Sequence, residues 1–161
     1  MRRLLPLILL ALASPLAARD SLGVFGQWGA FRDPDVPRCY AIAMAEPSRE
    51  RRSFDPYASV GTWPDRRIRG QLHFHVSREL ADAPRLRLVV GGSSFELTGG
   101  GSDAWAADAG QDAAILAAMR AGSRMTLSAT DSAGRRFTDS YRLEGAATAI
   151  DAAVVGCART R

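Results

Sequence analysis

Short stretches in which apolar and polar residues alternate follow one another along most of the chain. In residues 70–76 (GQLHFHV), an extended backbone places Leu72, Phe74 and Val76 on one face and polar side chains on the other. One apolar and one polar face are typical of an antiparallel sheet. Similar runs, each predicting extended structure, occupy residues 23–31, 39–45, 57–63, 86–90, 94–98, 125–130 and 136–143.

Turn residues separate these runs and predict how neighbouring strands are joined. Gly91 and Gly92 lie between residues 86–90 and 94–98, and the segment DSAG ending at Gly134 separates residues 125–130 from 136–143. Both are hairpin signals, because glycine adopts the positive φ that tight turns require. The segment DPDVP before Cys39 is rich in proline and aspartate, and no helix crosses such a sequence.

Two segments have helical spacing instead. In the first, Asp108 can cap a helix with Gln111 three residues later, and Gly122 can end it in a left-handed conformation. Its apolar stripe consists of Ile115, Leu116 and Met119.

The second helical segment lies near the C-terminus. It starts at Thr148 and Asp151 and stops at Gly156, directly before Cys157. Its apolar side consists of Ile150, Val154 and Val155. Together these patterns predict a mainly β protein, an antiparallel β-sandwich of seven to nine strands with two short helices, the second of them C-terminal.

The first residues have the layout of a secretory signal peptide. Arg2 and Arg3 precede an apolar stretch over residues 4–16, which ends in small residues. About 13 apolar residues are fewer than the roughly 20 that a membrane-spanning helix needs, although a retained membrane anchor is the alternative. We therefore expect residues 1–18 to be a signal peptide that is cleaved near Ala18.

The rest of the chain, residues 19–161, has the length of a single domain, which we expect in the periplasm or secreted, without a membrane span and as a monomer. No cysteine stands directly after the apolar stretch, so no lipid anchor is expected there. The net charge of +4 falls to about +2 once the leader's two arginines are removed. Basic and acidic residues are interspersed, which argues against nucleic acid as a partner.

Two groups of arginines come nearest to a basic patch. The first comprises Arg49, Arg51 and Arg52, and the second comprises Arg66, Arg67 and Arg69. Both lie beside proline and aspartate in loop-like sequence, so each is either a solvated loop or a site for an anionic partner. Trp63 precedes the second group, and we take Trp63, Arg66, Arg67 and Arg69 as a candidate binding patch.

The chain resembles the invasion-associated locus B family of secreted bacterial proteins. The resemblance is carried by Trp28 in FGQWGAF, by PRCYAIA around Cys39, and by a helix-and-hairpin block over residues 112–153. It implies a periplasmic or secreted β-sandwich and supplies no catalytic signature. Members of the family commonly have more cysteines, including a pair just before the first helix, where this chain reads GGGSDAWAADA. Their pairing therefore cannot be transferred to this chain.

The chain has two cysteines, Cys39 and Cys157. In an oxidising compartment an isolated pair is most simply one disulfide, here closing a loop of about 118 residues. A redox-active or nucleophilic thiol would need a partner at CxxC spacing or an orienting His and Asp, and neither is evident. Free or intermolecular thiols remain the other alternative.

His73 and His75 are the only histidines, and on a strand they share one face about 7 Å apart. Metal sites use this spacing, but no further ligand stands at motif distance, since Glu79 lies past the strand. We expect an exposed polar face, with a metal site as the alternative. The three tryptophans, Trp28, Trp63 and Trp105, are expected in the core, with Trp63 as the best candidate for an exposed aromatic.

These observations favour a binding protein over an enzyme. The sequence has no GxSxG motif and no phosphate-binding loop, and it implies no cofactor. We expect a non-catalytic protein that binds another protein or an envelope component. Two alternatives stay open: an inhibitor of a periplasmic enzyme that uses residues 63–69, and a metal-dependent hydrolase that uses His73 and His75.

Overall fold

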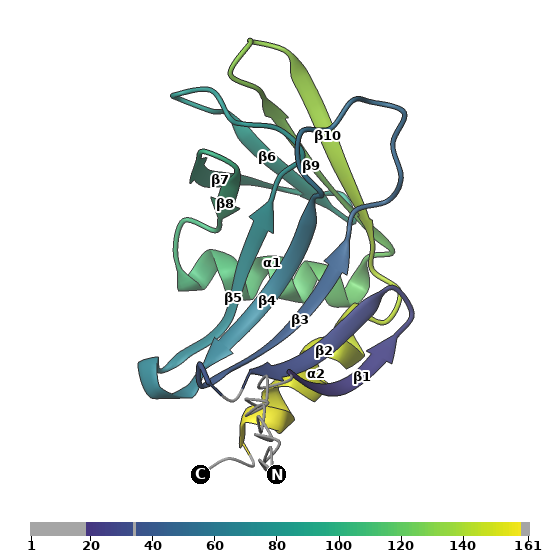
Figure 1. Ribbon diagram of the computed structural model, residues 1–161, viewed down its shortest axis with the longest axis vertical. Coiled ribbons are helices and arrows are strands. Elements are labelled where there is room, and N and C mark those ends of the chain that lie inside the picture. Colours follow the sequence, from purple (N-terminus) through teal and green to yellow (C-terminus); the bar gives the residue numbers. More distant parts are fainter. Residues whose placement is uncertain (1–18, 34, 159–161) are drawn as a thin grey trace, which may run out of the picture.

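The structure, a computed structural model, describes residues 19–33 and 35–158 (Figure 1). The expected leader, residues 1–18, lies outside the described residues. Ten strands form an antiparallel sheet in the order β1-β2-β3-β4-β5-β8-β7-β6-β9-β10. Their bounds are Asp20–Phe25 (β1), Trp28–Asp33 (β2), Arg38–Met44 (β3), Tyr57–Trp63 (β4), Ile68–His75 (β5), Leu86–Val90 (β6), Ser93–Gly100 (β7), Asp103–Trp105 (β8), Arg124–Thr130 (β9) and Arg136–Arg142 (β10).

The sheet curls so that its two halves face each other. Strand β7 pairs with β8 on one side and with β6 on the other, and β6, β9 and β10 cross the ends of β3, β4 and β5 (Figure 1). The rings of Phe74 in β5 and Tyr141 in β10 meet in the core at 5.6 Å. The Glu46 N–H, just after β3, donates to the Ser140 carbonyl at 2.7 Å. The predicted antiparallel sandwich is therefore confirmed.

The number of strands is higher than the predicted seven to nine, for two reasons. The run over residues 23–31 is two strands, because Gly26 turns the chain with a φ of +57°. Strand β8 has three residues, too few to show an alternating pattern. The two predicted hairpins are confirmed as β6–β7 and β9–β10.

The first helix, α1 (Ala109–Ala121), starts as its sequence predicts. The Asp108 carboxylate accepts the Gln111 N–H at 2.8 Å, and the Gln111 side chain accepts the Ala107 N–H at 2.8 Å. Its end differs from the prediction, because Gly122 has an extended conformation (φ −89°) instead of a left-handed one. Glycine suits this position because an added Cβ would lie 3.2 Å from the Ala118 carbonyl oxygen, which is a tight contact.

The second helix, α2 (Ala146–Ala158), packs against the β1–β4 half of the sheet. The predicted apolar side is right for Ile150, which is buried, and wrong for Val154 and Val155, which are 40% and 49% exposed. The helix also begins before Thr148 and includes Gly156. Small residues face the sheet, with Ala146, Ala149, Ala153 and Gly156 among those buried. They let the helix lie close to the strands, and an added Cβ on Gly156 would come within 2.5 Å of the Leu22 side chain.

The two cysteines form a disulfide, as predicted. Cys39 in β3 and Cys157 in α2 are both buried, with their Cα atoms 5.7 Å apart. The bond therefore joins the last turn of α2 to the sheet beneath it. Among the described residues, neither helix is long and apolar enough to cross a lipid bilayer.

Candidate functional site

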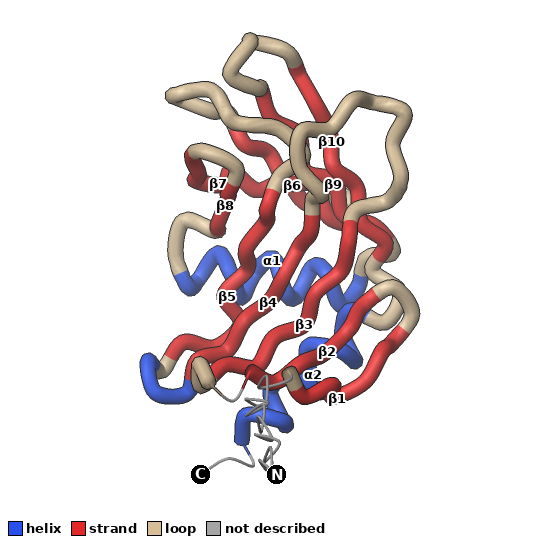
Figure 2. The backbone as a smooth tube through the Cα atoms, in the orientation of Figure 1, coloured by secondary structure: helices blue, strands red, loops and turns tan. Residues whose placement is uncertain are grey.

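The turn between β4 and β5 carries the candidate binding patch. A short 3₁₀ helix, η1 (Pro64–Arg66), follows directly after Trp63, and proline at its first position fixes the φ that such a turn needs. Arg67 then adopts a left-handed conformation (φ 56°), and its N–H donates to the Pro64 carbonyl at 3.1 Å. Figure 2 shows this turn at the same end of the sheet as the end of α2.

The structure brings the predicted patch residues together, but they differ in how exposed they are to solvent. Arg66, Arg67 and Arg69 are exposed, and within the described chain none of them forms an ion pair. Trp63 is half-buried, because its ring lies against Gly61, where an added Cβ would stand 2.5 Å from it. The patch is thus three free guanidinium groups beside an aromatic ring that lies on the sheet.

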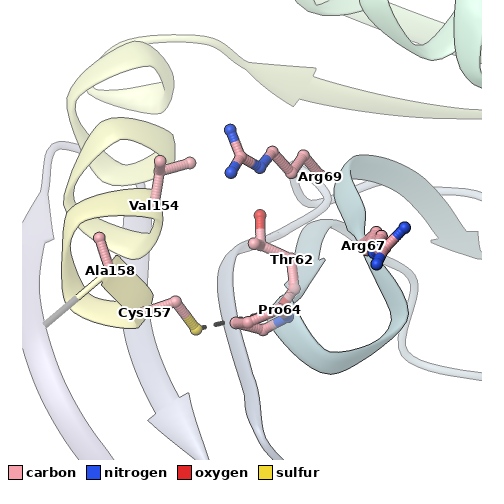
Figure 3. A pocket seen from close by; sticks show the side chains of 7 residues that line it. All are labelled: Thr62, Pro64, Arg67, Arg69, Val154, Cys157 and Ala158. Carbon is pink, nitrogen blue, oxygen red and sulfur yellow. Dashed lines mark hydrogen bonds between the residues drawn. The ribbon is translucent and has the colours of Figure 1, made fainter. Parts of the chain in front are cut away.

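A pocket of about 450 Å³ separates this turn from the last turn of α2. It is lined by Thr62, Pro64, Arg67, Arg69, Val154, Cys157 and Ala158 (Figure 3). Arg69 extends toward α2 and ends near Val154, whereas Arg67 lies on the outer side of the turn (Figure 3). The Cys157 sulfur lies 4.0 Å from the Thr62 carbonyl oxygen, and its disulfide partner Cys39 pairs with Thr62 across β3 and β4, so the disulfide fixes the α2 wall against the strand that leads into the turn.

The lining of the pocket combines apolar walls with positive charge. Proline, valine and alanine side chains supply the walls, and two guanidinium groups stand at the rim. A guanidinium offers a planar set of donors that fits carboxylate and phosphate oxygens. The arrangement can therefore hold a ligand with both an anionic and an apolar part.

Sequence reasoning found the arginine side of this site and missed the α2 side. Val154, Cys157 and Ala158 share one face of the helix through their i, i+3, i+4 spacing. The predicted disulfide implied that the Cys157 face of the helix packs against the sheet. The helical spacing from Cys157 was therefore the signal that could have added Val154 and Ala158 to the predicted site.

The other arginine group lies elsewhere, and one of its members, Arg52, has a structural role. The loop between β3 and β4, which contains Arg52, is at the opposite end of the sheet from η1 (Figure 1). Arg52 donates to the Glu46 carbonyl at 2.7 Å and lies 3.8 Å from the buried carboxylate of Asp139. The two groups do not form one basic surface.

His73 and His75 lie on the outer face of β5 and share one acidic partner that the sequence analysis did not identify. The Asp103 carboxylate in β8 accepts hydrogen bonds from His73 Nε2 at 2.8 Å and His75 Nδ1 at 3.2 Å. Burial alone would raise the pKa of Asp103, but the hydrogen bonds from the two imidazoles outweigh it and lower that pKa. Within the described residues, no three His, Cys, Asp or Glu side chains are grouped so as to hold a metal ion.

Aromatic rings surround this histidine pair. Tyr57 stacks on His75 and Trp105 stacks on His73, each with ring centroids 5.3 Å apart. Burial and the nearby charge of Asp103 raise the pKa of Tyr57. The predicted core position is wrong for Trp105, which is 38% exposed because β8 directs it outward.

Trp28 does belong to the core, as predicted. It is fully buried, and its indole N–H donates to the Arg142 carbonyl at 2.8 Å. Its position is set by β2, the strand next to β3, which carries Cys39.

Comparison with known proteins places the chain in a family. Residues 65–154, more than half of the chain, match the family model described as "Invasion associated locus B (IalB) protein". The fold is similar to the crystal structure of invasion associated protein B from Bartonella henselae, with a TM-score of 0.57 and 21% identity over 83% of this chain and 95% of that chain. No curated protein sequence matches. The chain belongs to the invasion-associated locus B family, an extracytoplasmic bacterial family.

Proposed function

We propose that this protein acts in the periplasm or as a secreted protein, after removal of a leader near Ala18, as a non-catalytic binding protein. Its contact surface is the patch of Trp63, Arg66, Arg67 and Arg69. The observation that carries the proposal is that three exposed arginines, two on the β4–β5 turn and one at the start of β5, have no ion-pair partner in the described chain. Their donors are free to meet an acidic surface on a protein or an envelope component.

The turn is also ordered before any partner arrives. Pro64 fixes its start, the Arg67 N–H closes it, and the disulfide at Cys157 lies on the other side of the adjoining pocket. Binding to an ordered loop avoids much of the entropy cost of fixing its residues. A rigid turn of this kind also suits an enzyme inhibitor, so inhibition of a captured hydrolase would assign the protein that narrower role.

The test is affinity capture from the extracytoplasmic fraction of the source bacterium. We expect the triple variant Arg66→Ala, Arg67→Ala, Arg69→Ala to lose a partner that the natural protein retains. The matched control replaces Arg49, Arg51 and Arg87, which are exposed, have no ion pair in the described chain and lie outside this turn. Equal capture by the triple variant and the natural protein would remove the patch from consideration.

A second candidate function, hydrolysis, is favoured by one observation. The Ser59 hydroxyl lies 3.5 Å from His73 Nδ1, and Asp103 accepts from Nε2 of the same ring, which groups the residue types of a Ser-His-Asp set with the roles of the two ring nitrogens exchanged. The first distance is at the outer limit of a hydrogen bond, which ranks this candidate second. Ester hydrolysis, with and without added zinc, that disappears in Ser59→Ala or His73→Ala would establish an enzyme in place of a non-catalytic binder.

A further inference from the structure

We infer that the pocket between the β4–β5 turn and the end of α2 binds a small anionic amphiphile, a single carboxylate on an apolar chain, with Arg69 contacting the carboxylate. This inference rests on the proposed binding role of the same turn and names the class of ligand. The carboxylate would lie at the arginine rim, and the apolar chain would lie between the turn and the helix.

The walls of the pocket account for the apolar part of the ligand. Its volume of about 450 Å³ falls in the range of small-molecule sites, about 300–1,000 Å³. Val154 and Ala158 stand one helical turn apart on α2, opposite Pro64 across the pocket (Figure 3). Val154 is 40% exposed although it is apolar, so covering it would remove hydrocarbon surface from water.

The charged groups account for the anionic part. Arg69 extends toward α2 and has no ion pair in the described chain (Figure 3). Among the described residues, those that line the pocket include a second arginine, Arg67, and no acidic side chain. The Thr62 hydroxyl points into the same space and can donate an additional hydrogen bond (Figure 3). A ligand with an anionic group and an apolar chain would therefore find positive charge for the first and an apolar surface for the second.

The end of α2 beside the pocket favours a carboxylate over a multiply charged phosphate as the ligand of Arg69. The C-terminal end of α2 carries partial negative charge from the helix dipole, which opposes a concentrated negative charge beside it. A single negative charge held by one planar guanidinium in two parallel hydrogen bonds reduces that repulsion. Arg67, on the outer side of the turn, adds positive potential without direct contact.

Isothermal titration of the full-length mature protein with decanoate tests the inference. We expect saturable binding of one decanoate, weakened at least tenfold by Arg69→Gln and by Val154→Asp. Arg66→Gln is the matched control, because Arg66 lies on the same turn and does not line the pocket. Thermal unfolding of each variant establishes that it is folded.

Three ligands without one of the two features complete the test. Acetate and inorganic phosphate lack the chain, and decanol lacks the charge, so each should bind at least tenfold more weakly than decanoate. Equal binding of decanol, or unchanged decanoate binding by folded Arg69→Gln, would overturn the inference. Partner capture that depends on the arginines without decanoate binding would leave the proposed function standing and reject only the ligand class.

Discussion

Asp139 has no exposed surface, and only one of its carboxylate oxygens accepts a hydrogen bond in the described chain. Oδ2 accepts the Ser77 N–H at 2.9 Å, whereas Oδ1 lies 3.8 Å from the Arg52 guanidinium. Burial raises the pKa of Asp139, although the Ser77 hydrogen bond and the charge of Arg52 oppose this effect. The folded protein therefore holds this proton to higher pH than the unfolded chain does.

This raised pKa gives a prediction with a definite sign. Stability should fall as pH rises from about 3.9, the ordinary value for aspartate, through the raised pKa of Asp139, because the folded state binds the proton more tightly in that window. Asp139→Asn has no such group and does not lose this contribution. Its free energy of unfolding should therefore rise relative to that of the natural protein as pH increases across this window. Urea unfolding at a series of pH values measures the difference.

Asp103→Asn supplies the opposite case. The pKa of Asp103 is lowered, so its contribution is present above the ordinary aspartate value and is lost as pH falls through the lowered pKa. The difference in free energy of unfolding between Asp103→Asn and the natural protein should therefore become smaller as the pH falls through the lowered pKa. If either variant unfolds in parallel with the natural protein at every pH, the assignment for that residue is wrong.

The histidine pair gives a third prediction at the residue scale. Among the described residues no group of three His, Cys, Asp or Glu side chains could hold a metal ion, so the two imidazoles fall short of the three or four ligands that zinc needs. We expect titration of the untagged protein with zinc to give no saturable heat. A saturable heat that His73→Ala and His75→Ala both abolish would contradict this prediction.

At the scale of elements, one glycine fixes the start of α2. Gly145 has a φ of +83°, and an added Cβ would lie 1.8 Å from the Phe25 carbonyl oxygen. Glycine is therefore required there both by the backbone conformation and by the close approach of the turn between β1 and β2.

A pair of substitutions separates these two requirements. Gly134→Ala, at a φ of +78° with nothing within 4 Å of the added Cβ, should lower the free energy of unfolding by about 1 kcal/mol from backbone strain alone. Gly145→Ala adds a clash with backbone and should cost about 3 kcal/mol or more. Urea unfolding compares them, and equal losses would show that the close approach contributes nothing.

The elements also show how far sequence reasoning reaches. Alternation in residues 70–76, the glycine turns of both hairpins and the Asp108 cap are local signals, and the structure bears them out. The buried side of α2 was misjudged because hydrophobicity favours Val154, whereas close packing on a sheet favours Ala149 and Ala153.

Asp103, the acidic partner of the two histidines, could not be predicted from local sequence signals. Asp103 meets His75 because β8 pairs with β5 across 28 residues of chain, and strand pairing of this kind has no local signature. The arginine side of the pocket could be predicted because its residues are neighbours in sequence. The α2 side depended on knowing how the helix docks.

At the scale of the whole molecule, the disulfide joins segments separated by 118 residues. In the chain-entropy model, closing a loop of this length in the unfolded state stabilises the fold by about 4–5 kcal/mol. We expect the double variant Cys39→Ala, Cys157→Ala to lose about this much free energy of unfolding in urea.

The state of the thiols is checked separately on the natural protein. Titration with Ellman's reagent in denaturant, without reductant, should detect no free thiol, since both cysteines are in the bond. Detection of two thiols per chain would show that the bond does not form in the isolated protein.

The position of the bond also sets when the fold can be completed. Cys157 follows every described strand of the sheet in the chain, so the cross-link cannot close until all of these strands have been synthesised and both cysteines have reached an oxidising compartment. From then on, residues 39–157 form a covalent ring. A protease that cuts once in the loop between β3 and β4 would leave two fragments still joined, which migrate as separate bands only after reduction.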